Sequence, residues 1–160
     1  MAKKGNKKSN TKNLIMNVVA LVGALIAGVG LFLNVWTSYM KSEYGYADAS
    51  VKLFNEDLAN CDAAFCARVF EVLAIVVVIA IIASVVLSLV TNKASMITTI
   101  LNIVALAAIV VAVVCACIFF IANHSVELGT TIAMKGAVGF YMIAIGGIVG
   151  SVAAFLASRK

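Results

Sequence analysis

Four long apolar stretches constrain the fold of this chain more than any other feature. A helix needs about 20 mainly apolar residues to cross the bilayer hydrocarbon, where only helices and closed barrels satisfy all their backbone polar groups. The stretches lack the alternating segments of about ten residues that a barrel requires. We therefore expect an all-α integral membrane protein whose four transmembrane helices form an antiparallel bundle. The expected spans are 14–35, 69–90, 97–122 and 137–157.

The composition excludes a water-soluble domain. The 160 residues are 64% hydrophobic and 12% charged, whereas soluble domains are typically about 45–50% apolar and about 25% charged. The same figures exclude a folded basic domain that binds nucleic acid. We expect a basic tail at 1–13, a transmembrane domain at 14–157 and a short tail at 158–160. The first span is longer than the roughly 7–15 apolar residues of a signal peptide, so we expect it to remain as an anchor.

The distribution of lysine and arginine predicts the orientation. If the N-terminus is inside, eight basic residues lie in inner segments and four in outer segments, which agrees with the positive-inside rule. The inner residues are Lys3, Lys4, Lys7, Lys8, Lys12, Lys93, Arg159 and Lys160, and the outer residues are Lys41, Lys52, Arg68 and Lys135. Both termini are therefore expected in the cytoplasm, with the protein in the plasma or cytoplasmic membrane. The lysine-rich tail is expected to bind anionic lipid, although its role as a topology signal alone explains it.

The loop at 37–68 is the only connection long enough to have structure of its own. Val51, Phe54 and Leu58 recur at helical spacing, which predicts a short amphipathic helix at 48–60. Aromatic residues gather at the outer ends of the spans, and interfacial rings prefer the headgroup level. The predicted outer aromatic rim comprises Trp36, Tyr39, Phe119, Phe120 and Tyr141.

Small residues predict where helices approach closely. The fourth span carries Gly146 and Gly150 in GxxxG spacing with Ala154 one turn further, and the first span carries Gly23 and Gly28. In a bilayer such residues let helix backbones pack against each other. Packing inside one chain is expected, with a dimer interface as the alternative.

Two asparagines are expected inside the membrane. Asn17 and Asn102 lie a few residues in from the inner ends of their spans, at nearly equal depth. An amide at that depth requires a hydrogen-bond partner, and each could supply one to the other. The alternative is that each bonds to a neighbouring carbonyl group or to interfacial water.

Two cysteines and an arginine precede the second span, and a glutamate lies near its start. Cys61 and Cys66 are a disulfide candidate if the outer side is oxidising. If their segment is a straight helix, positions five apart point in different directions and the bond cannot form. A metal site is disfavoured because two thiolates without nearby histidines are an incomplete zinc ligand set. Arg68 and Glu71 are helical neighbours and are expected to form an interfacial ion pair, the alternative being a functional site at the ionisable group.

One family resemblance accompanies these features. A large first outer loop opens after Trp36, contains Cys61 and Cys66, and ends with Arg68 in the string Cys-Ala-Arg-Val-Phe. With four spans, this pattern resembles the claudin and peripheral-myelin-type tetraspan superfamily. The resemblance covers roughly 36–90 and the topology. It implies lateral self-association and a role in adhesion or in a barrier.

The sequence contains little that could perform catalysis. It has one histidine and no Walker loop, His-Glu-x-x-His or Gly-x-Ser-x-Gly motif. We expect neither an enzyme nor a cofactor, but a small tetraspan that organises membrane through contacts with copies of itself or with a partner membrane protein. One alternative is an accessory subunit of a larger membrane complex. The other is a channel or transporter subunit, with a pore between chains lined by Asn17, Asn102, Thr98, Ser84 or Ser88.

Overall fold

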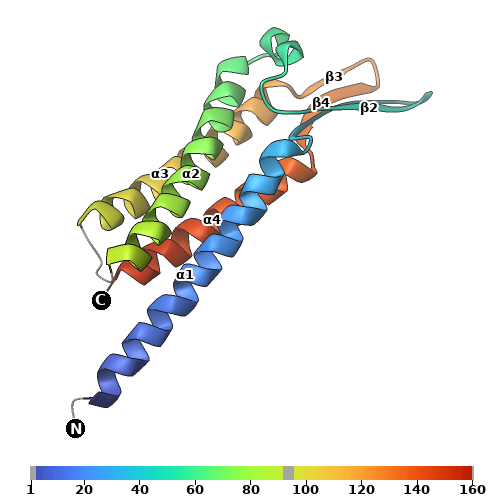
Figure 1. Ribbon diagram of the computed structural model, residues 1–160. Helices are drawn as coiled ribbons and strands as arrows, with labels where there is room; N and C mark the ends of the chain where they lie inside the picture. The colour runs from blue at the N-terminus through green and yellow to red at the C-terminus, as the bar shows by residue number, and fades with distance from the viewer. Residues whose placement is uncertain (1–2, 92–95, 160) are drawn as a thin grey trace.

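The computed structural model describes residues 3–91 and 96–159, with side chains from residue 11 onward. Four long helices form a bundle, and a small antiparallel sheet projects from one end of it (Figure 1). The helices are α1 (Lys3–Phe32), α2 (Ala64–Thr91), α3 (Met96–Ala122) and α4 (Val138–Ser158), with a short 3₁₀ helix η1 (Glu56–Asn60). The strands are β1 (Trp36–Ser42), β2 (Gly45–Val51), β3 (Ser125–Glu127) and β4 (Thr130–Gly136). We call the end with the sheet the sheet end; α1 begins and α4 ends at the opposite, far end.

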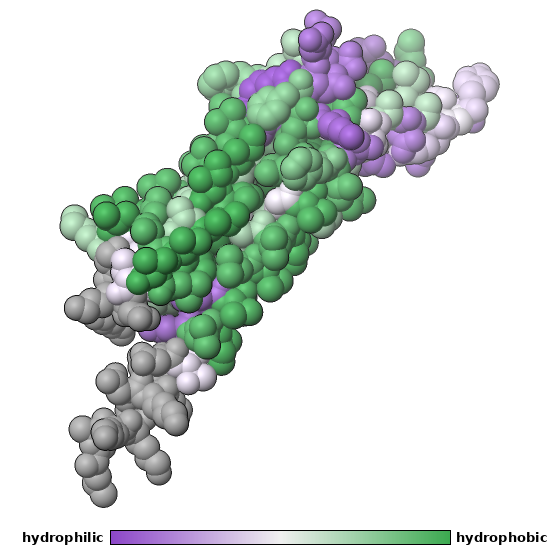
Figure 2. Space-filling view, viewed as in Figure 1, coloured by the Kyte–Doolittle hydropathy of each residue, from purple (hydrophilic) through white to green (hydrophobic). Residues whose placement is uncertain are grey.

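All four helices are long and apolar enough to cross a membrane. Hydrophilic residues gather mainly at the sheet end, and the helix surface that Figure 2 shows is mostly hydrophobic. All four helices expose large apolar side chains. A soluble bundle would bury such residues and place charges outside. The arrangement therefore indicates an integral membrane protein, as the sequence predicted.

The expected all-α architecture is wrong outside the helices. The connections after α1 and α3 each contain a hairpin, and the two hairpins join in one sheet of order β2-β1-β4-β3. The helix predicted at 48–60 is replaced by the second half of β2 and by η1. Of the three apolar residues that predicted this helix, Val51 is in β2, where seven residues pair with β1, whereas Phe54 is in the loop and Leu58 in η1.

The helix boundaries also differ from those expected. α1 ends at Phe32, short of the predicted 35, because the chain turns there to enter β1. α2 begins at Ala64, before the predicted 69. The basic tail is helical from Lys3 and forms the first part of α1. The side chains of its first four lysines lie outside the described residues, so most of the predicted contact with anionic lipid does too.

Glycine allows α1 and α4 to pack closely, as predicted for contacts inside one chain. A Cβ atom on Gly23 would lie 2.6 Å from the backbone nitrogen of Gly150, and one on Gly146 would lie 2.6 Å from the carbonyl oxygen of Gly23. Any side chain at these positions would force the backbones apart. Gly28 is not part of this contact, since the nearest atom to its Cβ position is in Val78 of α2, at 4.0 Å.

The antiparallel α1–α4 packing continues directly into the sheet. β1 leaves α1 and β4 leads into α4, and the two strands pair with Trp36 opposite Gly136. Between helix and strand, the Gly139 amide donates to the Asn34 carbonyl at 2.9 Å. The position of the sheet is therefore fixed by the bundle rather than by a flexible linker.

Buried apolar residues form two clusters along the bundle. In the far half they are mainly small or aliphatic: Ala20, Ala24, Val77, Ala80, Ile81, Val85, Ala105, Ala108, Ile109, Ala153 and Ala154. At the sheet end they include four aromatic residues among aliphatic ones: Val35, Trp36, Leu58, Ala67, Phe70, Ala74, Ala112, Ala116, Phe119, Phe140 and Ile143. The two halves are therefore packed from different kinds of residue.

Candidate functional site

Trp36 lies at the centre of the sheet end, fully buried. It is the first residue of β1, not the end of a helix, and this places its indole between the sheet and the helices. Four rings from α2, α3 and α4 surround it with centroids 5.0–6.0 Å away, mostly edge-on, an arrangement favoured by aromatic pairs. They belong to Phe70, Phe119, Phe120 and Phe140. We call these five residues the aromatic cluster.

The predicted aromatic rim is therefore largely wrong. Trp36 and Phe119 are inside the protein, and Phe120 is partly buried against the same cluster. Tyr141 is exposed at the start of α4, and Tyr39 lies half-buried on the sheet. The rings gather at one end of the bundle as expected, but most of them join the sheet to the helices instead of contacting headgroups.

A buried carboxylate connects the aromatic cluster to a charge. Glu71 has no exposed surface, and its two oxygens bind different partners. One accepts a hydrogen bond of 2.9 Å from the Trp36 indole N–H, and the other pairs with Arg68 at 2.9 Å. The predicted ion pair is present, and Trp36 is the third member that the sequence did not reveal. We call Trp36, Glu71 and Arg68 the buried network.

Arg68 extends the network to the loop between β2 and η1. Its second terminal nitrogen donates to the Asn55 carbonyl at 2.6 Å, and its guanidinium lies 6.0 Å from the ring centre of Phe54. Phe54 has φ of 57°, a backbone conformation that bulky residues rarely adopt. The contacts to Arg68 thus hold a strained turn in place. Through Glu71, which bonds to Trp36, the same network also reaches β1.

The turns of both hairpins lie side by side at the end of the sheet farthest from the bundle. β1 runs away from the bundle and β4 runs back, so the turns at 43–44 and 128–129 are neighbours, with Lys41 opposite Thr131. We call these two turns the distal edge. Tyr44 and Leu128 are both fully exposed there, and β2 beside them is exposed along almost its whole length. These are large apolar groups with no cover from the described part of the chain.

One face of the sheet carries a polar cluster. The Lys135 ammonium donates to the Tyr46 hydroxyl at 2.8 Å and lies 5.1 Å from the ring centre of Tyr39. Tyr46 in turn donates to Asp48 at 3.4 Å. The hydrogen bond to Tyr46 raises the pKa of Lys135, and the carboxylate of Asp48 also contributes. Lys135 therefore remains a cation on this face at any physiological pH.

The predicted disulfide is absent, and both cysteines are free thiols. Cys61 follows η1, with its sulfur 3.9 Å from the Asp57 carbonyl oxygen. Cys66 is on α2 and is partly buried against the apolar cluster of the sheet end. Cys61 lies in the turn before α2 begins, so the two cysteines are not on one straight helix as the alternative assumed. Burial raises the pKa of the Cys61 thiol, and the Asp62 carboxylate raises it further, so this thiol is a weak nucleophile at neutral pH.

The two asparagines of the far half do not bind each other. The Asn102 amide donates to the Ala154 carbonyl at 2.9 Å and accepts from the Ser84 hydroxyl at 2.5 Å. Asn17 donates to Ser88 at 3.3 Å. The alternative expectation of a neighbouring carbonyl holds for Asn102. Asn17 therefore joins α1 to α2, and Asn102 joins α3 to both α2 and α4.

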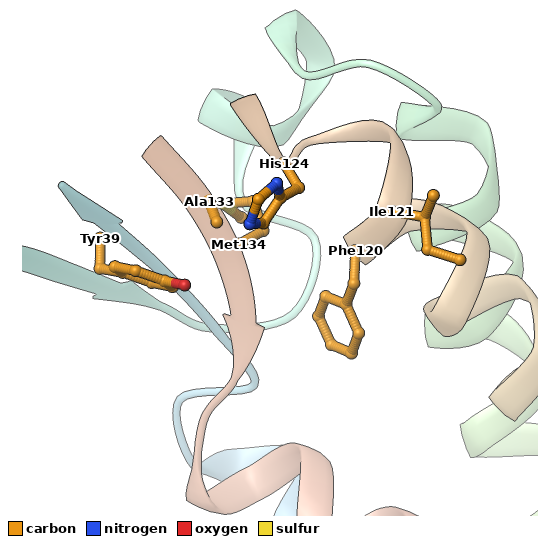
Figure 3. A pocket seen from close by; sticks show the side chains of 6 residues that line it. All are labelled: Tyr39, Phe120, Ile121, His124, Ala133 and Met134. Carbon is orange, nitrogen blue, oxygen red and sulfur yellow. The ribbon is translucent and has the colours of Figure 1, made fainter. Parts of the chain in front are cut away.

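An open depression of about 350 Å³ lies where α3 meets the sheet (Figure 3). Its lining comes from the last turn of α3, from the short connection between α3 and β3, and from β1 and β4. The lining residues are Tyr39, Phe120, Ile121, His124, Ala133 and Met134. The Tyr39 hydroxyl and the His124 ring supply its polar side chains, and the remainder is apolar. We call it the α3–sheet pocket.

Comparisons with known proteins do not place the chain in a family. Protein-family models give no match, and a search of curated proteins gives no significant match. Among residues 3–91 and 96–159, no group of three or more histidine, cysteine or acidic side chains is arranged to hold a metal ion. The site's chemistry must therefore be argued from its own geometry.

Proposed function

We propose that this protein is a non-enzymatic tetraspan that makes protein–protein contacts through the distal edge of its sheet. The partner is a second copy or another membrane protein, as the resemblance to claudin-like tetraspans would also imply. The observation that carries the proposal is the pair of fully exposed residues, Tyr44 and Leu128, at the adjacent tips of two hairpins. Tyrosine is a typical anchor of protein interfaces, and the backbone conformation of Leu128 is what indicates a contact there.

The backbone at Leu128 supports a role in contact. Leu128 and Gly129 both have positive φ, 47° and 79°, as in the type I′ turns of two-residue hairpins. Asparagine, aspartate or glycine normally occupies the first position, and leucine there is disfavoured by about 1 kcal/mol. Full exposure of a leucine to water adds a further cost. A residue that is unfavourable for the fold on both counts is explained if a partner covers it.

The buried network supports a presentation role for the sheet. Trp36, Glu71 and Arg68 hold the base of β1 against α2, and β4 continues into α4. The distal edge therefore projects at a defined position relative to the membrane, which lowers the entropy lost on binding. The proposed orientation places the sheet outside and both termini in the cytoplasm, in agreement with the positive-inside distribution of lysine and arginine.

The geometry does not favour the rival pore between chains. Of the five residues named for such a pore, Asn17, Asn102, Ser84 and Thr98 are buried inside the bundle of one chain, and Ser88 is half-buried. Side chains in that position cannot line a passage formed between two copies. The sheet end offers exposed surface to a second protein, whereas these residues do not.

Site-specific photocrosslinking in native membranes tests the proposal. A benzophenone amino acid is placed at position 44 or 128, and at Phe65 as a control that is equally apolar and 77% exposed but lies at the start of α2. We expect a discrete protein adduct from positions 44 and 128, with its mass identifying a second copy or another protein. Equal adducts from position 65, or none at the distal edge, would contradict the proposal.

The variant Leu128→Asn tests whether Leu128 makes the contact, without destabilising the fold. Asparagine suits the first position of a type I′ turn, so the melting temperature should stay the same or rise, with up to about 1 kcal/mol of added stability. The same change should abolish the adduct formed from position 44. An undiminished adduct in a stable Leu128→Asn protein would show that the edge is not the contact surface.

Thiol labelling of single-cysteine variants tests the orientation independently. Glu43→Cys, in a background with all four native cysteines replaced, should react with an impermeant maleimide from outside intact cells, whereas Ser158→Cys should not. The reverse pattern would refute the proposed orientation.

A further inference from the structure

We propose that the α3–sheet pocket binds the acyl chain and head of a single membrane amphiphile, a fatty acid or a phospholipid. The shared chemistry is a flexible hydrocarbon chain with a hydrogen-bond-accepting head such as a carboxylate, ester or phosphate. This inference goes beyond the proposed contact function, because the pocket lies at the base of the sheet and not at its distal edge.

The lining of the pocket has the polarity that such a molecule requires. Phe120, Ile121 and Met134 supply apolar surface, and the His124 ring and the Tyr39 hydroxyl supply polar groups (Figure 3). Neither the His124 imidazole nor the Tyr39 hydroxyl has a hydrogen-bond partner among the described residues of the chain. Both are able to donate to an accepting head group. A volume of about 350 Å³ is within the range of small-molecule sites.

The edge of β4 adds further hydrogen-bonding groups. β3 pairs with β4 only from Thr130 to Ile132, whereas β1 pairs with β4 as far as Gly136. The part of β4 that lines the pocket, at Ala133 and Met134, thus has a strand on one side only. Backbone polar groups on an unpaired strand edge are available to a ligand.

The position of the pocket indicates that its occupant comes from the membrane. Exposed apolar residues lie at helical spacing along one face of α3 and lead to its last turn: Val110, Val114, Ile118 and Ile121. Ile121, the last of them, is itself part of the pocket wall. A hydrocarbon chain lying on this stripe can therefore extend into the pocket without leaving an apolar surface, while its head reaches the level of His124.

Photolabelling of the full chain in phosphatidylcholine nanodiscs tests the inference. The probes are a diazirine-bearing palmitic acid and a phosphatidylcholine with the same diazirine chain. Lipid contact alone labels α3, so the diagnostic readout is the label on the β4 segment at 130–136. We expect saturable labelling of that segment by at least one probe.

A pair of matched variants separates the pocket from the stripe. Ile121→Trp should fill the pocket entrance and reduce β4 labelling at least fivefold. Ile118→Trp, on the same stripe but outside the pocket, should leave it unchanged. Both positions are exposed, so both proteins should fold, which a melting curve checks. No β4 label, or equal β4 labelling in the two variants, would overturn the inference.

Competition distinguishes the two sources of the ligand. If excess palmitic acid removes the label, the ligand is a free fatty acid; if only added phospholipid removes it, the ligand is a bilayer lipid. Either result supports an amphiphile site. If label persists on 130–136 under both competitors, the labelling is nonspecific and the site is refuted.

Discussion

The sheet end and the far half of the bundle hold the same four helices together by different chemistry. At the sheet end, bulky rings surround Trp36, and a charge pair on α2 closes the cluster. In the far half, Gly23, Gly146 and Gly150 bring α1 and α4 into backbone contact, and Asn102 bonds to a carbonyl of α4. Close contact between the backbones of α1 and α4 continues at the sheet end, where Gly30 meets Gly139. The sheet end therefore differs by the large side chains and the buried carboxylate that it adds.

The difference follows from what each half must position. In the far half only helices meet, and close approach of small residues gives strong packing where lipid removes any hydrophobic driving force. At the sheet end the helices must also carry a sheet that projects beyond them. A large indole with a directional N–H fixes both packing and orientation, which small residues cannot do.

Loss of Arg68 should produce the largest effect on the sheet end. Arg68→Ala leaves the Glu71 carboxylate buried without its cation, and removal of one partner of a buried pair typically costs about 3–5 kcal/mol. Because the Arg68 side chain is 31% exposed, we expect about 3 kcal/mol. Equilibrium unfolding of the protein in mixed micelles measures the change.

A double variant identifies the origin of that loss. Arg68→Met combined with Glu71→Gln removes both charges but retains an acceptor for the Trp36 N–H, so most of the stability should return. If the double variant is as unstable as Arg68→Ala, the unpaired charge is not the cause.

Gly23→Ala tests the close packing of the far half. The added Cβ would lie 2.6 Å from the backbone nitrogen of Gly150, so the helices must shift, at a cost of about 1–3 kcal/mol. Gly28→Ala is the matched control, because its Cβ has 4.0 Å of clearance from Val78 and alanine favours the helix. A similar loss of stability in both variants would show that α1–α4 contact is not the cause.

Asn102→Leu should have a smaller effect. The change removes bonds to Ser84 and to the Ala154 carbonyl, and such bonds contribute about 1 kcal/mol between membrane helices. Asn17→Leu removes a longer bond, of 3.3 Å, and should cost less. The same unfolding titration ranks the two variants, and the reverse order would mean that the amide geometry does not govern this region.

Ser151→Ala is expected to have the smallest effect, with the opposite sign. The Ser151 hydroxyl is buried and has no hydrogen-bond partner among the described residues, so its removal should leave stability unchanged or raise it by up to about 1 kcal/mol. A clear destabilisation in the unfolding titration would reveal a partner that the static structure does not show.

The sequence predicts local and compositional features well. Apolar length alone locates the four helices, and three-residue spacing locates the Arg68–Glu71 pair. Both signals come from contiguous residues. Small residues at helical spacing predicted which faces of α1 and α4 pack closely, but not that Gly23 would meet Gly146.

The sheet and the third member of the buried network depend on contacts between distant segments. Trp36 and Glu71 are 35 positions apart, and no local pattern connects an indole with a carboxylate at that separation. β1 pairs with β4 from the other loop, so neither hairpin reveals the sheet alone. Gly45 and Gly129, between β-branched and aromatic residues, were the one available signal for hairpins.

Hydrogen–deuterium exchange in lipid nanodiscs tests most directly whether the buried network holds the sheet on the bundle. In the unmodified protein, amides of β1 and β4 should be protected. In Arg68→Ala they should exchange at least tenfold faster, while α1 and α4 around Gly23 and Gly146 keep their protection. Unprotected strands in the unmodified protein, or an equal loss of protection in both halves of the variant, would contradict the account.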